Sequence, residues 1–212
     1  MNKETWGYLS LAVSIAGYIP YFHSIISGKS KPHVFSWIVW SWASCFLFVA
    51  QFLRGAGAGA WVTGITALAS VLVMLLSLKY GEKSITHSDE TVFGLSLAAL
   101  PLWVITESPL WSVVLLVGIC AFGFFPTFRK SYDNPHEELA VFYLSNVFKF
   151  LFGFLALENY AASTALYPVY GVLANGAFVA MLLWRRNSMI RVPGHIVETE
   201  SVSIATSPSS AA

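Results

Sequence analysis

Charged side chains are scarce in this sequence. They make up 11% of its 212 residues, against 56% hydrophobic residues. A soluble domain usually carries about 25% charged residues. So few charges cannot cover the surface of a soluble protein of this size, but they are sufficient if most of that surface faces lipid. The composition therefore predicts an integral membrane protein embedded in a lipid bilayer.

Net charge and cysteine are also low, and each excludes a class of protein. The formal net charge is +1, which gives no support for a nucleic-acid partner. The two cysteines, Cys45 and Cys120, each lie within an apolar run. A disulfide framework or a zinc site needs more cysteines at other spacings. We therefore expect two buried, inert thiols, no metal and no cofactor. No nucleophile, base and acid occur in a catalytic pattern, so we do not expect an enzyme.

Seven apolar runs predict an all-α, polytopic fold, since a membrane-spanning helix needs about 20 residues. The first run begins at Trp6 without a signal-peptide cleavage site. The fourth is short and contains Pro101, so we expect neighbouring helices to cover it. Asn134, Pro135 and Glu137 form a helix-start pattern for the sixth, with Glu137 placed to complete a capping box. The expected spans are 6–27, 33–53, 58–79, 91–106, 109–128, 136–157 and 161–184.

Basic residues are distributed unevenly between the two ends of these spans. One end holds two of them, Lys3 and Arg54. The other end holds nine: Lys29, Lys31, Lys79, Lys83, Arg129, Lys130, Arg185, Arg186 and Arg191. Because Lys and Arg collect in cytoplasmic loops, this predicts an N-terminus outside and a C-terminus in the cytoplasm. We expect the Ser- and Thr-rich segment 193–212 to be a disordered cytoplasmic tail.

The chain also contains an internal repeat. Two segments share the pattern Gly-x-x-Pro-x-Phe at an offset of 106, and each is followed by a short basic loop and a Pro-His pair. The matching segments are 17–22 with 123–128, 32–33 with 135–136, Gly64 with Gly171, and 74–76 with 181–183. Chance similarity between apolar segments is the alternative. Matches in the same order at nearly one offset predict a duplication.

A duplicated three-helix unit needs an extra helix, because a direct copy would insert upside down. We therefore predict a first repeat over residues 6–80, a linker helix over 91–106 and a second repeat over 109–185. Parallel repeats about an axis along the membrane normal are one known plan for transporters, with the substrate bound between the repeats.

These features resemble the SWEET and PQ-loop (MtN3-like) transporter superfamily over about residues 6–185, and its bacterial members more than the plant sugar carriers. The resemblance rests on the three-one-three arrangement, the outside N-terminus, and Gly-x-x-Pro followed by a basic loop and a second Pro in each repeat. It implies a bacterial inner-membrane protein with hinge or gate roles for Pro20, Pro32, Pro126 and Pro135. Neither Pro20 nor Pro126 is followed by Gln, which leaves the subfamily and the substrate open.

The residues themselves support weak points at Pro20 and Pro126, because a proline inside a helix cannot donate a backbone hydrogen bond four residues back. The alternative is that the four prolines only end or begin helices.

Lys149 is the most informative polar residue, because it lies deep within the sixth span. A charged side chain facing lipid there costs roughly 2.5–3.5 kcal/mol or more. We therefore expect Lys149 to face the interior of the bundle, with Asn146 one turn earlier on the same face. The alternative is that the long side chain of Lys149 extends toward the outer lipid headgroups.

Other polar and aromatic residues share a helix face. Trp37, Trp40, Ser41 and Ser44 lie three and four residues apart in the second span, and together offer flat rings and hydroxyls. Asn175, in the seventh span, needs a partner on a neighbouring helix or on a ligand. Plain helix packing is the alternative. The predicted substrate-binding residues are Trp37, Trp40, Ser41, Asn146, Lys149 and Asn175.

The leading hypothesis is therefore a transporter that moves a small polar solute, such as a sugar, nucleoside, vitamin or amino acid, by alternating access. A membrane sorting or accessory protein without transport activity is the main alternative. A retinal-binding seven-helix protein is a third, since Lys149 could form a Schiff base. The sequence leaves the oligomeric state open, a homo-oligomer included.

Overall fold

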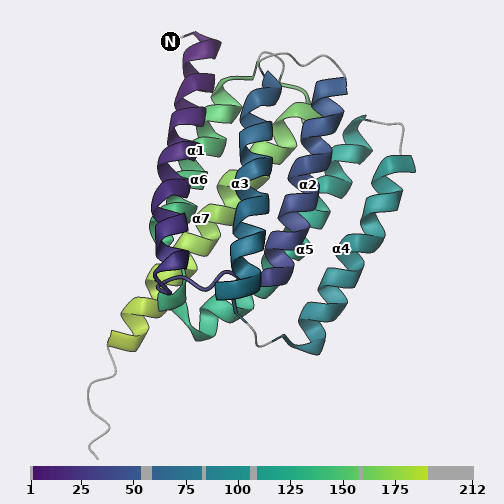
Figure 1. The fold of residues 1–212 in the computed structure, drawn as a ribbon. Coiled ribbons are helices and arrows are strands. Elements are labelled where there is room, and N and C mark those ends of the chain that lie inside the picture. Colours follow the sequence, from purple (N-terminus) through teal and green to yellow (C-terminus); the bar gives the residue numbers. More distant parts are fainter. Residues whose placement is uncertain (1, 54–58, 83–84, 106–108, 158–159, 191–212) are drawn as a thin grey trace, which may run out of the picture.

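The structure is a computed structural model that describes residues 2–53, 59–82, 85–105, 109–157 and 160–190. These residues form a bundle of seven α-helices (Figure 1). Each expected span overlaps one helix, and the predicted tail 193–212 lies outside the described residues. The helices are α1 (Lys3–Ile26), α2 (Val34–Leu53), α3 (Gly59–Tyr80), α4 (His87–Ile105), α5 (Pro109–Asp133), α6 (Ala140–Leu155) and α7 (Ala162–Ile190).

The start of the sixth helix corrects a prediction. Residues Pro135–Glu137 form a separate 3-10 turn, and the Asn134 side chain makes no capping hydrogen bond. Helix α6 begins only at Ala140, after Leu139. The expected capping box is absent because Glu137 pairs with Lys31 instead, and because Glu138 turns into the protein interior. At 16 residues, α6 is also shorter than the predicted span.

The surroundings of helix α4 also differ from the prediction. It packs against α5 and, over a smaller area, against α2, and it lies at an edge of the bundle (Figure 1). Leu95 and Leu97 are exposed on it. As far as the structure describes this helix, its helix neighbours α5 and α2 lie on one side only, so it is not covered all round as expected.

Three helical segments are long and apolar enough to cross a membrane, which indicates membrane association: Lys3–Ile26, Val113–Asp133 and Ala165–Met189. Helices α2, α3 and α6 contain shorter apolar stretches among the residues described. Large apolar side chains also lie on the outer surface, among them Ile19, Leu68 and Leu173, each more than 60% exposed. Seven membrane crossings stay a prediction.

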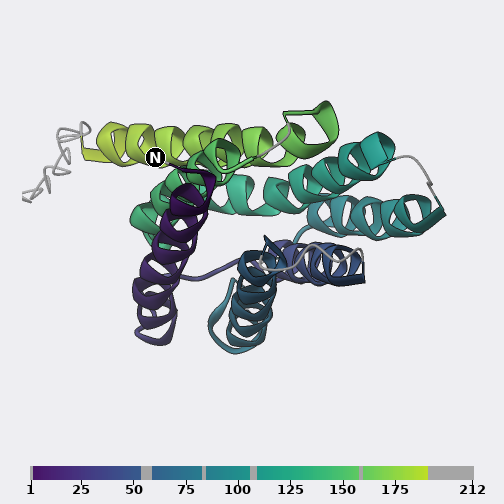
Figure 2. The same cartoon turned by 90° about the horizontal axis from the view of Figure 1, so that it is seen from above.

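The packing order of the helices is the same in both halves of the chain. Helix α3 packs on both α1 and α2, and α7 packs on both α5 and α6. Between the halves, α1 packs on α6 and α2 packs on α5. Seen from above, α7 and α5 lie along one side of the bundle and α1, α3 and α2 along the other (Figure 2). Exchanging α1–α3 with α5–α7 therefore leaves this list of helix contacts unchanged.

Candidate functional site

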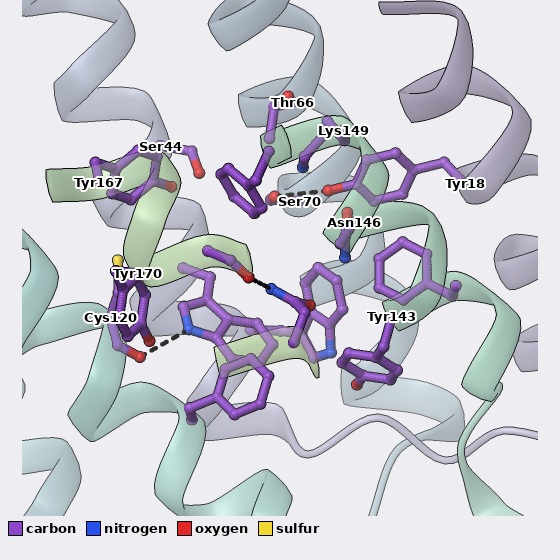
Figure 3. A pocket seen from close by; sticks show the side chains of 17 residues that line it. Tyr18, Ser44, Thr66, Ser70, Cys120, Tyr143, Asn146, Lys149, Tyr167 and Tyr170 are labelled. Atoms are coloured by element: carbon purple, nitrogen blue, oxygen red, sulfur yellow. Dashed lines mark hydrogen bonds between the residues drawn. The ribbon is translucent and has the colours of Figure 1, made fainter. Parts of the chain in front are cut away.

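A cavity of about 70 Å³ lies between the two halves of the bundle (Figure 3). Six helices contribute to its wall, and none of the described side chains of α4 lines it. More than half of the lining residues are aromatic. They are Tyr18, Trp37, Trp40, Ser44, Thr66, Ser70, Cys120, Phe124, Phe142, Tyr143, Asn146, Lys149, Phe150, Tyr167, Tyr170, Gly171 and Asn175.

Lys149 lies at this cavity, as expected from its depth in the sixth span. Its side chain is only 6% exposed. Its backbone carbonyl accepts a hydrogen bond from Ser10 Oγ at 2.9 Å, which holds this turn of α6 against α1. The ammonium group lies 4.6 Å from the ring centroid of Phe150 and 5.9 Å from that of Tyr18. The side chain therefore does not extend along the outer surface of the bundle.

Trp37 and Trp40 also line the cavity, with their ring centroids 5.1 Å apart in an edge-to-face arrangement. Trp40 Nε1 donates to the carbonyl of Cys120 at 3.2 Å, so α5 fixes the orientation of this indole. Gly123 permits the approach, because a Cβ atom there would lie 2.8 Å from Val39 Cγ1 and 3.2 Å from Trp40 Nε1.

Ser41 does not line the cavity, although the shared helix face predicted it there. Its hydroxyl donates to the carbonyl of Trp37 at 2.6 Å, one turn back along its own helix. Serine in a helix often makes this bond, which withdraws the hydroxyl from other partners. Ser44, three residues later, lies at the cavity wall instead.

Asn146 and Asn175 both lie at the cavity. The amide of Asn175 donates to the carbonyl of Gly171 at 2.8 Å within its own helix. The sequence analysis expected a hydrogen-bond partner on a neighbouring helix or on a ligand, whereas the bond in the structure is made within α7. Asn146 is half-buried and lies near Lys149 (Figure 3).

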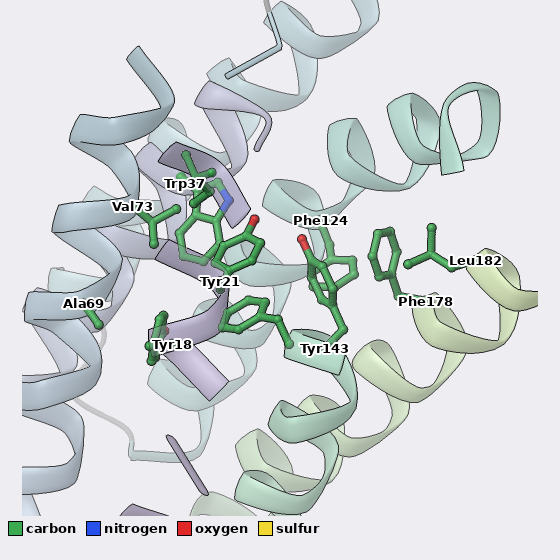
Figure 4. Close-up of a cluster of buried hydrophobic side chains, with 11 residues drawn as sticks. Tyr18, Tyr21, Trp37, Ala69, Val73, Phe124, Tyr143, Phe178 and Leu182 are labelled. Atoms are coloured by element: carbon green, nitrogen blue, oxygen red, sulfur yellow. The ribbon is translucent and has the colours of Figure 1, made fainter. Parts of the chain in front are cut away.

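A layer of aromatic side chains adjoins the cavity (Figure 4). Tyr21 and Phe142 stack with centroids 4.0 Å apart and planes 7° from parallel. Tyr143 and Trp37 pack beside them, each at most 2% exposed. Such rings exclude water, so this layer separates the cavity from the charged residues that follow.

Those charged residues form a buried cluster that the sequence analysis did not predict. Lys130 Nζ lies 2.9 Å from Glu138 Oε1, and both side chains are at most 3% exposed. The hydroxyls of Tyr21 and Tyr143 each donate to Glu138 Oε2 at 3.2 Å. In the sequence, Glu138 has only the features of an acidic residue near the start of the sixth span, where the helix dipole favours a negative charge. The signal in the sequence was that Lys130 and Glu138 both lie close to the second repeated motif in a chain with few charges.

The same region ties the two halves together through their loops. Lys31 N donates to the carbonyl of Glu137 at 2.8 Å, and the two side chains form an ion pair. Lys130 Nζ also donates to the carbonyl of Lys31. The Glu137 carboxylate raises the pKa of the Lys31 amine by accepting its hydrogen bond. All these contacts lie at the end of the bundle that the charge pattern predicts to be cytoplasmic.

A second buried carboxylate, Asp89, anchors the start of α4. Arg129 Nε donates to Asp89 Oδ1 at 3.1 Å, and the Thr86 backbone donates to Oδ2 at 3.0 Å. Burial alone would raise the pKa of this carboxyl, but the bonds from Arg129 and Thr86 outweigh burial and lower it. Asp89 lies before the expected fourth span, and His33 Nε2 lies 3.6 Å from it.

The four prolines occupy different settings. Pro20 and Pro126 lie inside α1 and α5, which continue for several residues beyond them, so neither proline ends its helix. Pro32 precedes α2 and accepts a hydrogen bond from the backbone of Glu82. Pro135 begins the 3-10 turn and accepts two bonds from Arg186. Their hinge and gate roles stay predictions.

Comparison of the chain with models of protein families, with characterised proteins and with solved structures found no match. The functional reading therefore depends on the geometry of the cavity and of the contacts around it.

Proposed function

We propose that this chain is a membrane transporter that moves a small polar solute by alternating access between two three-helix repeats. In this proposal α1–α3 and α5–α7 are the repeats, α4 is the linker, and the chain is of the SWEET and PQ-loop type. The observation that carries it is the cavity between the two halves, lined from both and adjoining a closed contact between their loops.

The matched glycines support the duplication. A Cβ atom at Gly64 of α3 would lie 2.8 Å from a ring carbon of Phe48 on α2. A Cβ atom at Gly171 of α7 would overlap the ring of Phe150 on α6. The repeat pairs these glycines, and each admits a phenylalanine ring of the preceding helix in its own half. This shared role is more than similar composition explains.

The loop contacts support a gate. Residues Lys31 and Glu137 come from different halves, and Lys130 bonds to both Lys31 and Glu138. A rocking motion of the halves has to break these bonds to open the cavity at this end. The contacts are polar and local, so they can break and form again without disturbing the apolar faces of the helices. Pro32 and Pro135 each lie within two residues of the Lys31–Glu137 pair.

A reversible cross-link tests the proposal. Lys31→Cys with Glu137→Cys, in a background with Cys45 and Cys120 changed to Ser, places two thiols where the backbones already share a hydrogen bond. Disulfides form at Cα separations of about 4.4–6.8 Å. In proteoliposomes we expect flux of a transported solute to stop on oxidation and return on reduction. Each single-cysteine variant is the control.

The solutes to screen are sugars, nucleosides, vitamins and amino acids. Flux that continues through the cross-linked protein would contradict alternating access at this end. Absence of flux with every solute, from protein that remains folded, would instead favour a sorting or accessory role.

A further inference from the structure

The unusual residue at the cavity is Lys149, because the described part of the chain supplies no acidic partner for it. No described aspartate or glutamate lines the cavity, and no hydrogen bond or ion pair joins the ammonium group to a described residue. An ion held in an apolar interior is unfavourable unless it is paired and hydrogen-bonded. The pairing group is therefore missing from the described protein itself.

Two other basic side chains, those of Lys130 and Arg129, differ from Lys149 in having a carboxylate partner. Lys130 is paired with Glu138, and Arg129 is paired with Asp89. Lys149, at 6% exposed, is nearly as buried as Lys130 at 3% and more buried than Arg129, whose side chain is 30% exposed, yet Lys149 lines the cavity with no carboxylate among the described residues beside it. A bound anion would give it the same kind of partner.

The groups around Lys149 also suit an anion with two oxygen atoms. Asn146 and Ser70 lie on the same side of the cavity as the ammonium group (Figure 3). The Ser70 hydroxyl and the Tyr18 hydroxyl are 3.5 Å apart, a weak contact that a better acceptor can replace. Elsewhere in the wall, the Tyr170 hydroxyl is buried without a hydrogen-bond partner.

The rest of the wall suits a flat ring. Trp40 stands between Trp37 and Phe124, with centroids 5.1 and 4.8 Å away. Its indole is held by the bond to Cys120, so its face is fixed in place before any ligand binds. Aromatic rings attract one another in tilted and offset arrangements. A planar ligand gains more from such a wall than a puckered one.

We propose that the solute is a small monoanion in which one carboxylate is attached to a flat, unsaturated ring. Lys149 holds the carboxylate and the Trp40 region holds the ring. A single cation favours a singly charged carboxylate over a doubly charged phosphate. This inference rests on the proposed function, because it takes the cavity to be the site of the solute.

The experiment measures binding to the detergent-purified full chain with matched pairs of probes. Benzoate against benzamide and nicotinate against nicotinamide test the charge, and benzoate against cyclohexanecarboxylate tests the ring. We expect the acid to bind at least tenfold more tightly than its amide, since hydrogen bonds to charged groups are worth about 1.5–3 kcal/mol. Lys149→Met should remove that preference and Lys149→Arg should keep most of it. Lys79→Met, which changes an exposed lysine, should have no effect.

The outcomes separate this inference from the proposed function. Tight binding or flux of neutral solutes without a preference for acids would overturn the anion proposal and leave transport intact. A preference for acids that survives in Lys149→Met would also overturn it. Equal binding of benzoate and cyclohexanecarboxylate would contradict the part of the proposal that requires a flat ring. Absence of both binding and flux for every probe would overturn the anion proposal together with the transporter proposal.

Discussion

Two buried lysines should respond in opposite ways to the same substitution. Lys149 has no carboxylate partner among the described residues, whereas Lys130 is bound to Glu138 at 2.9 Å. Both are at most 6% exposed, so burial does not distinguish them. Methionine keeps much of the length and volume of lysine and removes its charge. Comparing Lys149→Met with Lys130→Met therefore shows how a carboxylate partner changes the effect of removing a buried charge on stability.

For Lys149→Met we expect greater stability without ligand. Replacing buried ionic groups with apolar ones is often neutral or stabilising by about 1–4 kcal/mol. For Lys130→Met we expect a loss of about 3–5 kcal/mol, because the substitution leaves the Glu138 carboxylate buried and uncompensated. For a chain of this size, each kcal/mol shifts Tm by about 2–4 °C.

The assay is thermal unfolding of the purified variants in one detergent at neutral pH, with exposed Lys79→Met as the control for loss of a charge. A marked destabilisation by Lys149→Met would refute the reasoning, because it would mean that the lysine already has a stabilising partner within the protein. A neutral Lys130→Met would show that the Lys130–Glu138 pair is not formed in the folded state.

Three further predictions concern other parts of the molecule. Asp89→Asn should lower Tm at pH 7, because Arg129 loses its carboxylate. Since folding lowers the pKa of Asp89, its stabilisation is complete above about pH 3.9 and is lost as pH falls through the lowered pKa. The Tm difference should shrink on acidification, and exposed Glu90→Gln should show no such trend. Gly171→Ala should destabilise by about 1–3 kcal/mol through overpacking against Phe150, and Gly176→Ala, with open space at its Cβ position, should not. In intact cells, an impermeant thiol reagent should label Glu4→Cys and not Lys29→Cys in a background without other cysteines, and the reverse would overturn the predicted orientation.

Local patterns in the sequence were enough to predict the helices and their approximate limits, because apolar runs, glycine loops and prolines act locally. It also placed Trp37, Trp40, Asn146, Lys149 and Asn175 toward the interior, since helical spacing and the cost of a polar group in lipid both depend only on the segment itself. Ser41 is buried as well, at 3% exposed, but it does not line the cavity, and its hydroxyl bonds one turn back in its own helix.

Which residues far apart in the chain come into contact could be known only from the packing of the helices. Glu138 lies between a loop and the start of α6, yet it is buried against Lys130, Tyr21 and Tyr143. Cys120 and Tyr170 gave no local signal of a site and reach the cavity because α5 and α7 bring them there. Such contacts depend on the packing of helices that are far apart along the chain. Hydrophobic periodicity predicts which face of a helix is buried, but it does not predict which helix packs against that face.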